Sequence, residues 1–187
     1  MNYLKKIKYN SPVILSFTLL SLFAVILGYL TAGLSTQLLF CVYKSSPLNP
    51  LSYIRLFTHI LGHADWQHFL NNFMLILLVG PMLEEKYGSK KLLGMIVFTA
   101  FITGLINIIF FDTALLGASG IAFMLILLSS FANIKQGGIP LTLILVAVAY
   151  IGNEIINGLI SQDNISQLTH IIGGICGCGL GFVMNKK

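Results

Sequence analysis

Several polar side chains interrupt the long apolar runs of this sequence, and their types match those used in acyl-transfer chemistry. A serine can act as a nucleophile, a histidine as a general base, and a second histidine or a carboxamide as a hydrogen-bond donor to an oxyanion. Burying such groups among apolar residues costs free energy, so each of them needs a partner or a task. The set comprises His68, Asn71, Asn72, Asn107, Ser119, Asn153, Glu154, Asn157 and His170.

The composition indicates a membrane protein. The 187 residues include 11 Lys+Arg and 6 Asp+Glu, so charged residues make up 9% of the chain, against roughly 25% in an ordinary soluble domain. Apolar residues make up 56% and gather in blocks that a water-exposed surface could not accommodate. The net charge of +5 does not indicate nucleic-acid binding, because the basic residues stand in short groups beside the apolar blocks. We therefore exclude nucleic acid as a partner.

Six apolar stretches predict helices that cross the bilayer. They are Pro12–Gly33, Gln67–Leu83, Lys91–Phe111, Ser119–Ala132, Ile139–Ile160 and Leu168–Met184. At roughly 20 residues each, six helices use about 120 residues and leave no room for a soluble domain. The first stretch is longer than the apolar core of a secretory signal, so we expect it to be retained. The predicted fold is an all-α bundle of six transmembrane helices, with residues 1–187 forming a single membrane domain.

The basic residues predict how this bundle is oriented. With a cytoplasmic N-terminus, only Lys44 and Arg55 fall outside, whereas the other lysines lie inside. The starts of the second, fourth and sixth helices then meet in the outer half of the membrane. The polar groups that converge there are His68, Asn72, Ser119 and His170. We expect the plasma membrane of a prokaryote, both termini in the cytoplasm, and a site that opens outward.

The connection Leu34–Trp66 is the longest between predicted helices. It mixes prolines and aromatic residues with apolar ones, which is typical of a segment in the headgroup region. We expect it to associate with the membrane.

Each polar residue taken alone also has a purely structural explanation. A serine in a membrane helix usually donates to its own backbone, which is what we expect of Ser129 and Ser130 and what Ser119 could do as well. A histidine such as His170 often serves only to join helices. The combination of these residues, more than any one of them, therefore indicates catalysis.

Small residues predict how the serine and histidine could meet. Glycine recurs every fourth residue along one stripe of the sixth helix, at Gly173, Gly177 and Gly181. This stripe can approach another helix closely, and His170 lies on its side. The start of the fourth helix is also small, at Gly117, Ala118, Gly120 and Ala122. If these two stretches pack together, the imidazole comes within hydrogen-bond reach of the Ser119 hydroxyl.

The remaining donors fit an oxyanion site better than a metal site. His68 and Asn72 are four residues apart and share a helix face, so both can point at one oxygen, together with the Ser119 amide. The alternative is that they only tie helices together. His59, His63 and His68 have no carboxylate at ligand spacing, and the chain has no H-E-x-x-H. We expect no metal and no cofactor.

These residues resemble those of the rhomboid intramembrane serine proteases across essentially all six predicted helices. Arg55 followed by His63, His68 and Asn72 resembles the family's first-loop arginine and its H-x4-H-x3-N signature. The other matching motifs are Glu84 with Gly88 for E-x-x-x-G, Gly117-Ala118-Ser119-Gly120 for G-x-S-G, and His170-Ile171-Ile172-Gly173 for H-x-x-G.

The resemblance implies a role for each of these positions. Ser119 would be the nucleophile and His170 the general base of a dyad without a carboxylate, while His68, Asn72 and the Ser119 amide would hold the oxyanion. Arg55 and His63 would be structural, and the first loop would lie half in the membrane. Substrates would be membrane-spanning helices that are cut near their outer ends.

Two positions depart from the family pattern. Ile54 stands where an aromatic residue, often Trp, precedes the loop arginine, and Phe123 stands where a Tyr often packs beneath the histidine. The ring is kept at Phe123 but its hydroxyl is lost. We expect an altered hydrogen-bond network or rate, and still an active enzyme.

Two other functions stay open at this point. A rhomboid-like protein that binds membrane clients without cutting them would have the same fold, although loss of the serine or histidine marks that class. Glu154, with Asn153 and Asn157, suggests a proton-coupled transporter, but the chain shows no inverted repeat and its polar groups gather on one side. We expect Glu154 to be solvated at the membrane interface, with a role in substrate access as the alternative.

Overall fold

The computed structural model describes residues 8–131, 141–142, 144–146, 148–149, 152 and 164–185. This part of the chain is helical, and its one β-type contact is a single bridge between Val42 and Leu115. The helical elements are α1 (Pro12–Leu30), α2 (Leu34–Leu39), α3 (Pro50–Thr58), the 3₁₀ turn η2 (His59–Leu61), α4 (Trp66–Tyr87), α5 (Ser89–Phe110), α6 (Ser119–Ser129) and α8 (Asn164–Asn185).

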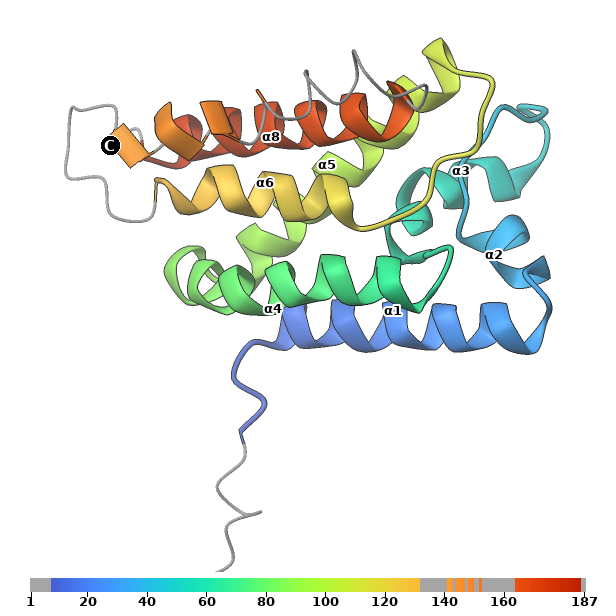
Figure 1. The fold of residues 1–187 in the computed structure, drawn as a ribbon, viewed down its shortest axis with the longest axis horizontal. Helices are drawn as coiled ribbons and strands as arrows, with labels where there is room; N and C mark the ends of the chain where they lie inside the picture. Colours follow the sequence, from blue (N-terminus) through green and yellow to red (C-terminus); the bar gives the residue numbers. More distant parts are fainter. Residues whose placement is uncertain are drawn as a thin grey trace, which may run out of the picture.

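The long helices alternate in direction. Figure 1 shows that α4, α6 and α8 begin at the end of the molecule where α1 and α5 finish and where α2 and α3 lie. We call this the serine end, because it contains Ser119, and the opposite one the glutamate end, because it contains Glu84. The starts of α4, α6 and α8 therefore do meet at one end, as the alternating spans predict.

Three of the described helices are long and apolar enough to cross a membrane. They are α1, α5 and residues 167–184 of α8, while α6 is apolar but shorter. Helix α4 has the required length but is less apolar, because its first turns contain Gln67, His68, Asn71 and Asn72. It also continues beyond the predicted end at Leu83 through Glu84, Glu85 and Lys86. The predicted helix Ile139–Ile160 is described only in part, and Asn153, Glu154 and Asn157 lie outside the described residues.

A carboxylate explains why α4 continues past Leu83. Glu84 is buried and accepts hydrogen bonds from the first amides of α1, Val13 N and Ile14 N, both at 3.0 Å. The Ser89 hydroxyl donates to it as well, at 2.7 Å. Amides in the first turn of a helix have no partner within that helix, so Glu84 acts as a cap supplied by a neighbouring helix.

The turn after α4 depends on a glycine. Gly88 ends α4 and precedes α5 with a φ of +82°, a left-handed conformation that side chains disfavour. Glu84 thus caps α1, and Gly88, four residues later, lets the chain reverse its direction into α5.

Helix α6 lies in the core, and α8 packs on it more extensively than any other described pair of elements. A Cβ atom on Gly173 would lie 2.1 Å from the Gly120 carbonyl oxygen, and one on Gly177 would lie 2.3 Å from that of Met124. Real Cβ atoms do not approach so closely, so the two backbones touch because these side chains are absent. The predicted close approach of the glycine stripe to the start of α6 is confirmed.

The first loop is more ordered than a simple connection. Asn49 caps α3 by accepting a hydrogen bond from Leu51 N at 3.0 Å, and Pro50 stands at the first helical position. Arg55 is buried within this loop, where its Nε donates to Leu51 O at 3.1 Å and its guanidinium lies 4.3 Å from the centre of the Tyr43 ring. The loop therefore packs on itself as well as on the helices.

Candidate active site

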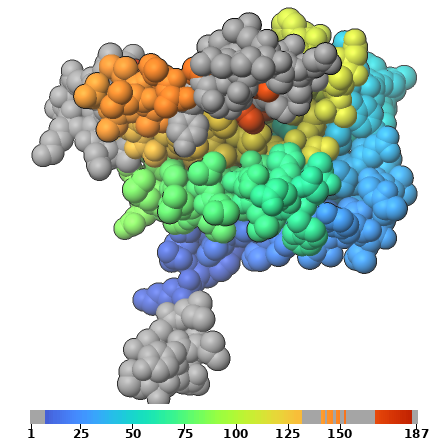
Figure 2. Space-filling view, in the orientation of Figure 1, coloured from blue at the N-terminus to red at the C-terminus, as the bar shows by residue number. Residues whose placement is uncertain are grey.

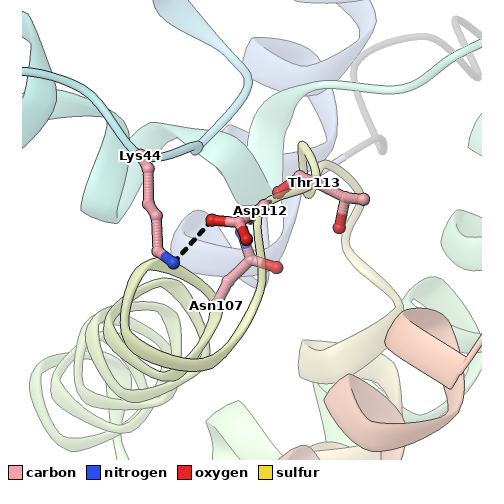
Figure 3. Close-up of polar contacts among 4 residues, drawn as sticks. All are labelled: Lys44, Asn107, Asp112 and Thr113. Carbon is pink, nitrogen blue, oxygen red and sulfur yellow. Dashed lines mark hydrogen bonds and ion pairs between the residues drawn. The ribbon is translucent and has the colours of Figure 1, made fainter.

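The segment that leads into Ser119 is joined to the first loop. Val42 and Leu115 exchange two backbone hydrogen bonds of 2.9 Å across the single bridge. Near this bridge, Lys44 Nζ lies 2.6 Å from an Asp112 carboxylate oxygen, an exposed ion pair that Figure 3 shows. Two segments far apart in the sequence are thus held side by side ahead of α6.

Asn107, in the last turn of α5, strengthens this junction. Its buried side-chain amide donates to Thr113 O at 3.0 Å and approaches Val42 O at 3.4 Å. Figure 3 shows Asn107 beneath the loop that carries Asp112 and Thr113. One carboxamide therefore contacts the backbones of both segments, which fixes the path of the chain toward Ser119.

Two histidines of the first loop hold the residues just before Ser119. Gly117 N donates to His59 O at 3.0 Å, and Ala118 N donates to His63 Nε2 at 3.4 Å. Burial lowers the pKa of His63 to about 4, so this imidazole is neutral at pH 7 and can accept that bond. Its Nδ1 then donates to Leu61 O at 3.2 Å. His63 is thus occupied in shaping the backbone of the site.

The first turns of α4 face the same stretch of backbone. Gly117 has a φ of +124°, and a Cβ there would lie 2.8 Å from the His68 ring and 3.9 Å from Asn72 Nδ2. Only glycine therefore lets the chain pass so close to these two side chains. Asp65 caps this helix by accepting from His68 N at 2.7 Å, which fixes its first turn.

Asn72 carries an unused donor. The residue is buried, and Nδ2 has no hydrogen-bond partner within the part of the chain that the structure describes. Leaving a buried N–H without a partner costs about 1–3 kcal/mol. A donor in this condition is suited to a group that arrives from outside the protein, such as a substrate oxygen.

His170 is placed beside the first turn of α6. Its ring stacks on that of Phe123, with centroids 4.4 Å apart and planes 4° from parallel. Phe123 is four residues after Ser119, one turn along the same helix. The contact between Gly173 and Gly120 fixes the position of α8 along the axis of α6. His170 is also close enough to His68 for their charges to interact.

The structure thus brings together four of the residues singled out in the sequence. Ser119, His68 and His170 are each half-buried, and Asn72 is buried beside Gly117. The first amides of α6 add donors, since the start of a helix leaves them without partners and carries partial positive charge. A hydroxyl, an imidazole and several hydrogen-bond donors at one place are the components of acyl-transfer chemistry.

Ser129, in the last turn of α6, has the structural contact that the sequence predicts for it. Its hydroxyl donates to Ile126 O at 2.6 Å, the backbone contact expected of a structural serine. Ser129 therefore bonds to the backbone of its own helix, as a structural serine does.

The fourth histidine, His59, is engaged with the backbone and with a threonine hydroxyl. His59 Nδ1 donates to Arg55 O at 3.2 Å, and its Nε2 lies 3.3 Å from the Thr103 hydroxyl. Among the described residues, no three His, Cys, Asp or Glu side chains gather as metal ligands would.

Two residues that the motifs include lie apart from this cluster. Arg55 is packed within the first loop. Glu84 is 16 residues beyond His68 on α4, or about 24 Å at a helical rise of 1.5 Å per residue. Conversely, the contributions of Val42 and of the His59 carbonyl could not be predicted, because backbone contacts between loops have no residue signature. Asn107 had a signal, as an amide within an apolar helix, but its partners could not be inferred.

The fold and this cluster together define a helical membrane protein with a serine and a histidine at one end of its bundle. A comparison with known families agrees: residues 50–187, which are 138 of the 187, match the family described as Rhomboid domain. The chain belongs to the rhomboid family, whose members are intramembrane serine proteases. None of the curated proteins with which the chain was compared matches it.

Proposed function

We propose that this protein is an intramembrane serine endopeptidase that cuts membrane-spanning proteins with a dyad of Ser119 and His170. The observation that carries this proposal is the stack of His170 on Phe123, one turn from Ser119, at the point where Gly173 and Gly120 bring α8 and α6 into contact. Membership of the rhomboid family supports the class of reaction.

The chemistry follows from the roles of these groups. The Ser119 oxygen attacks the carbonyl carbon of a peptide bond while His170 takes the hydroxyl proton. The tetrahedral oxyanion is held by His68, by Asn72 Nδ2 and by the Ser119 amide. Collapse of this intermediate breaks the C–N bond, and His170 gives its proton to the leaving amine. Water then hydrolyses the acyl-enzyme in the same manner.

Phe123 keeps the imidazole in position without a hydroxyl. The near-parallel stack of its ring on His170 supplies contact area and limits rotation of the histidine. A phenolic oxygen could donate a hydrogen bond in addition, and Phe123 has none. We propose that the stack contributes to orienting the base.

The arrangement in the membrane completes the proposal. Residues 1–187 form one domain of six spans, with both termini in the cytoplasm, the first loop half in the outer leaflet and the serine end opening outward. Water then reaches the half-buried Ser119 and His170 from outside. A substrate helix has to unwind near the cut, because a carbonyl that is hydrogen-bonded within a helix is not free for attack.

The proposal can be tested by reconstitution. Wild type, Ser119→Ala and the matched control Ser129→Ala are placed in liposomes with labelled single-span substrates, and the fragments are identified by mass spectrometry. We expect cleavage near the outer end of the span by wild type and by Ser129→Ala only. Cleavage by folded Ser119→Ala at the wild-type rate would refute the assignment. Binding without cleavage by folded wild type would favour a client-binding protein.

A further inference from the structure

An apolar groove separate from the serine site runs between α1 and α5. Its volume is about 450 Å³. Val13, Phe17 and Leu20 of α1 line one wall, and Leu93, Ile96 and Val97 of α5 line the other. Phe57, Ile60 and Leu61 of the first loop also line it. Both walls belong to helices apolar and long enough to cross a membrane. Leu20, Leu93 and Val97 in the lining are exposed, so we expect the groove to open toward the bilayer.

The length of the groove matches one leaflet. Its lining extends over nine residues, and so eight helical steps, of each helix, from Pro12 to Leu20 and from Ser89 to Val97. At 1.5 Å per residue this is about 12 Å, compared with about 15 Å for half of a hydrocarbon core. Helices α1 and α5 start at the same end of the molecule (Figure 1), so both walls cover the same leaflet. A substrate helix that crosses the membrane would need twice this depth.

The mouth of the groove, at the start of both helices, is basic. Lys8, Lys90 and Lys91 are exposed there. Lys90 precedes Leu93 by three residues and Val97 by seven, so it lies on the groove face of α5. Of the two carboxylate side chains that the described residues place at this end, Glu84 is buried and already paired, which leaves Glu85 exposed. The local charge therefore favours an anion.

We propose that this groove binds an anionic glycerophospholipid. One acyl chain lies between α1 and α5 with its tip against Phe57 and Leu61, and the phosphate contacts Lys90 and its basic neighbours. Basic pockets between membrane helices recognise anionic headgroups in this way. A transmembrane helix of a partner protein fits less well, because its apolar stretch is longer than the groove. The acyl chain would also brace η2, whose His59 carbonyl holds Gly117.

Headgroup selectivity tests the charge component. The full chain in mild detergent is mixed with equal amounts of phosphatidylglycerol and phosphatidylcholine that have the same acyl chains, and bound lipid is counted by native mass spectrometry. We expect wild type to retain the anionic lipid preferentially, and Lys90→Gln with Lys91→Gln to lose about fivefold of this preference per lysine. Lys44→Gln, at the other end, should keep it. Equal binding of both lipids by wild type would overturn the proposal.

Filling the groove tests the acyl component. Leu93→Trp and, independently, Val97→Trp place an indole where the chain should lie, at positions that are 50% and 43% exposed and so tolerate a larger side chain. We expect each variant to retain at least tenfold less phosphatidylglycerol than Leu78→Trp, a control on α4 at a position 77% exposed. Undiminished retention by both folded groove variants would show that the lipid binds elsewhere.

Discussion

The two ends of the bundle use buried polar groups in opposite ways, although α4 contributes to both. At the glutamate end, Glu84 is 4% exposed and accepts from Val13 N, Ile14 N and the Ser89 hydroxyl. Figure 2 shows α4 running across the middle of one face of the molecule, with α1 below it. A buried carboxylate with three donors is stable because its partners replace the lost water.

The polar groups at the serine end are more accessible than Glu84, and one buried donor among them has no partner in the described part of the chain. Ser119, His68 and His170 are half-buried, and Asn72 Nδ2 finds no partner among the described residues. Groups around them, such as His63 and Asn107, are engaged with the backbone. Buried atoms without a partner among the described residues also occur away from Ser119, for example Ser21 Oγ and Thr99 Oγ1. Asn72 Nδ2 differs from them in lying beside Gly117, within the cluster that we propose as the active site.

Among changes that test this difference, we expect the largest effect on the rate from a substitution of Asn72. Asn72→Ala should lower kcat by roughly 10²–10³-fold, because one oxyanion donor is removed. Its stability should change little, since the donor has no partner to lose among the described residues. Cleavage kinetics in liposomes measure the rate. Asn71→Ala, at the exposed neighbouring position, is the control and should cleave normally.

Glu84→Ala should produce the opposite result. Removing the carboxylate leaves Val13 N and Ile14 N without their partner, so the free energy of unfolding should fall by about 2–4 kcal/mol. The rate per folded molecule should stay near that of wild type. Unfolding in mixed micelles, with exposed Glu85→Ala as control, checks the stability. A large fall in kcat per folded molecule, with little change in the free energy of unfolding, would contradict this difference between the two ends.

Gly173→Ala should affect both stability and rate. The added methyl group would meet the Gly120 carbonyl, so α8 has to move away from α6 and take His170 with it. We expect a loss of about 1–3 kcal/mol in stability together with a lower kcat. Gly179→Ala, whose Cβ would meet nothing within 4 Å, tests whether any alanine in α8 has this effect. Equal behaviour of the two variants would contradict the packing argument.

The smallest effect concerns pH and His63. Burial lowers its pKa to about 4 from 6.5 in the unfolded chain, so its contribution to stability is complete above pH 6.5 and is lost as the pH falls toward 4. Between pH 7.5 and 5.5 this amounts to about 1 kcal/mol. His63→Gln should flatten the pH dependence of unfolding in this range, although His59 keeps its own share. An unchanged slope would show that His63 is not buried as a neutral base.

The sequence predicted which polar residues lie together better than it predicted the connections between them. The polar groups could be placed at one end because helix geometry determines the relevant patterns. These patterns are the alternating direction of the helices, the spacing of His68 and Asn72, and the spacing of Gly173 and Gly177. The sequence did not predict α2 and α3, which are short, or the bridge of Val42 and Leu115, which consists of backbone contacts. It also ended the second helix at Leu83, since a charged Glu84 inside a bundle is explained only by the distant α1 amides that it caps.

The most direct test of the account is whether Ser119 is activated by His170. A fluorophosphonate reacts with serine nucleophiles that a neighbouring base activates, and peptide mass spectrometry locates the adduct. We expect one adduct, on Ser119, in wild type and no adduct in folded His170→Ala. Labelling of Ser129 in place of Ser119, or equal labelling of Ser119 with and without His170, would contradict it.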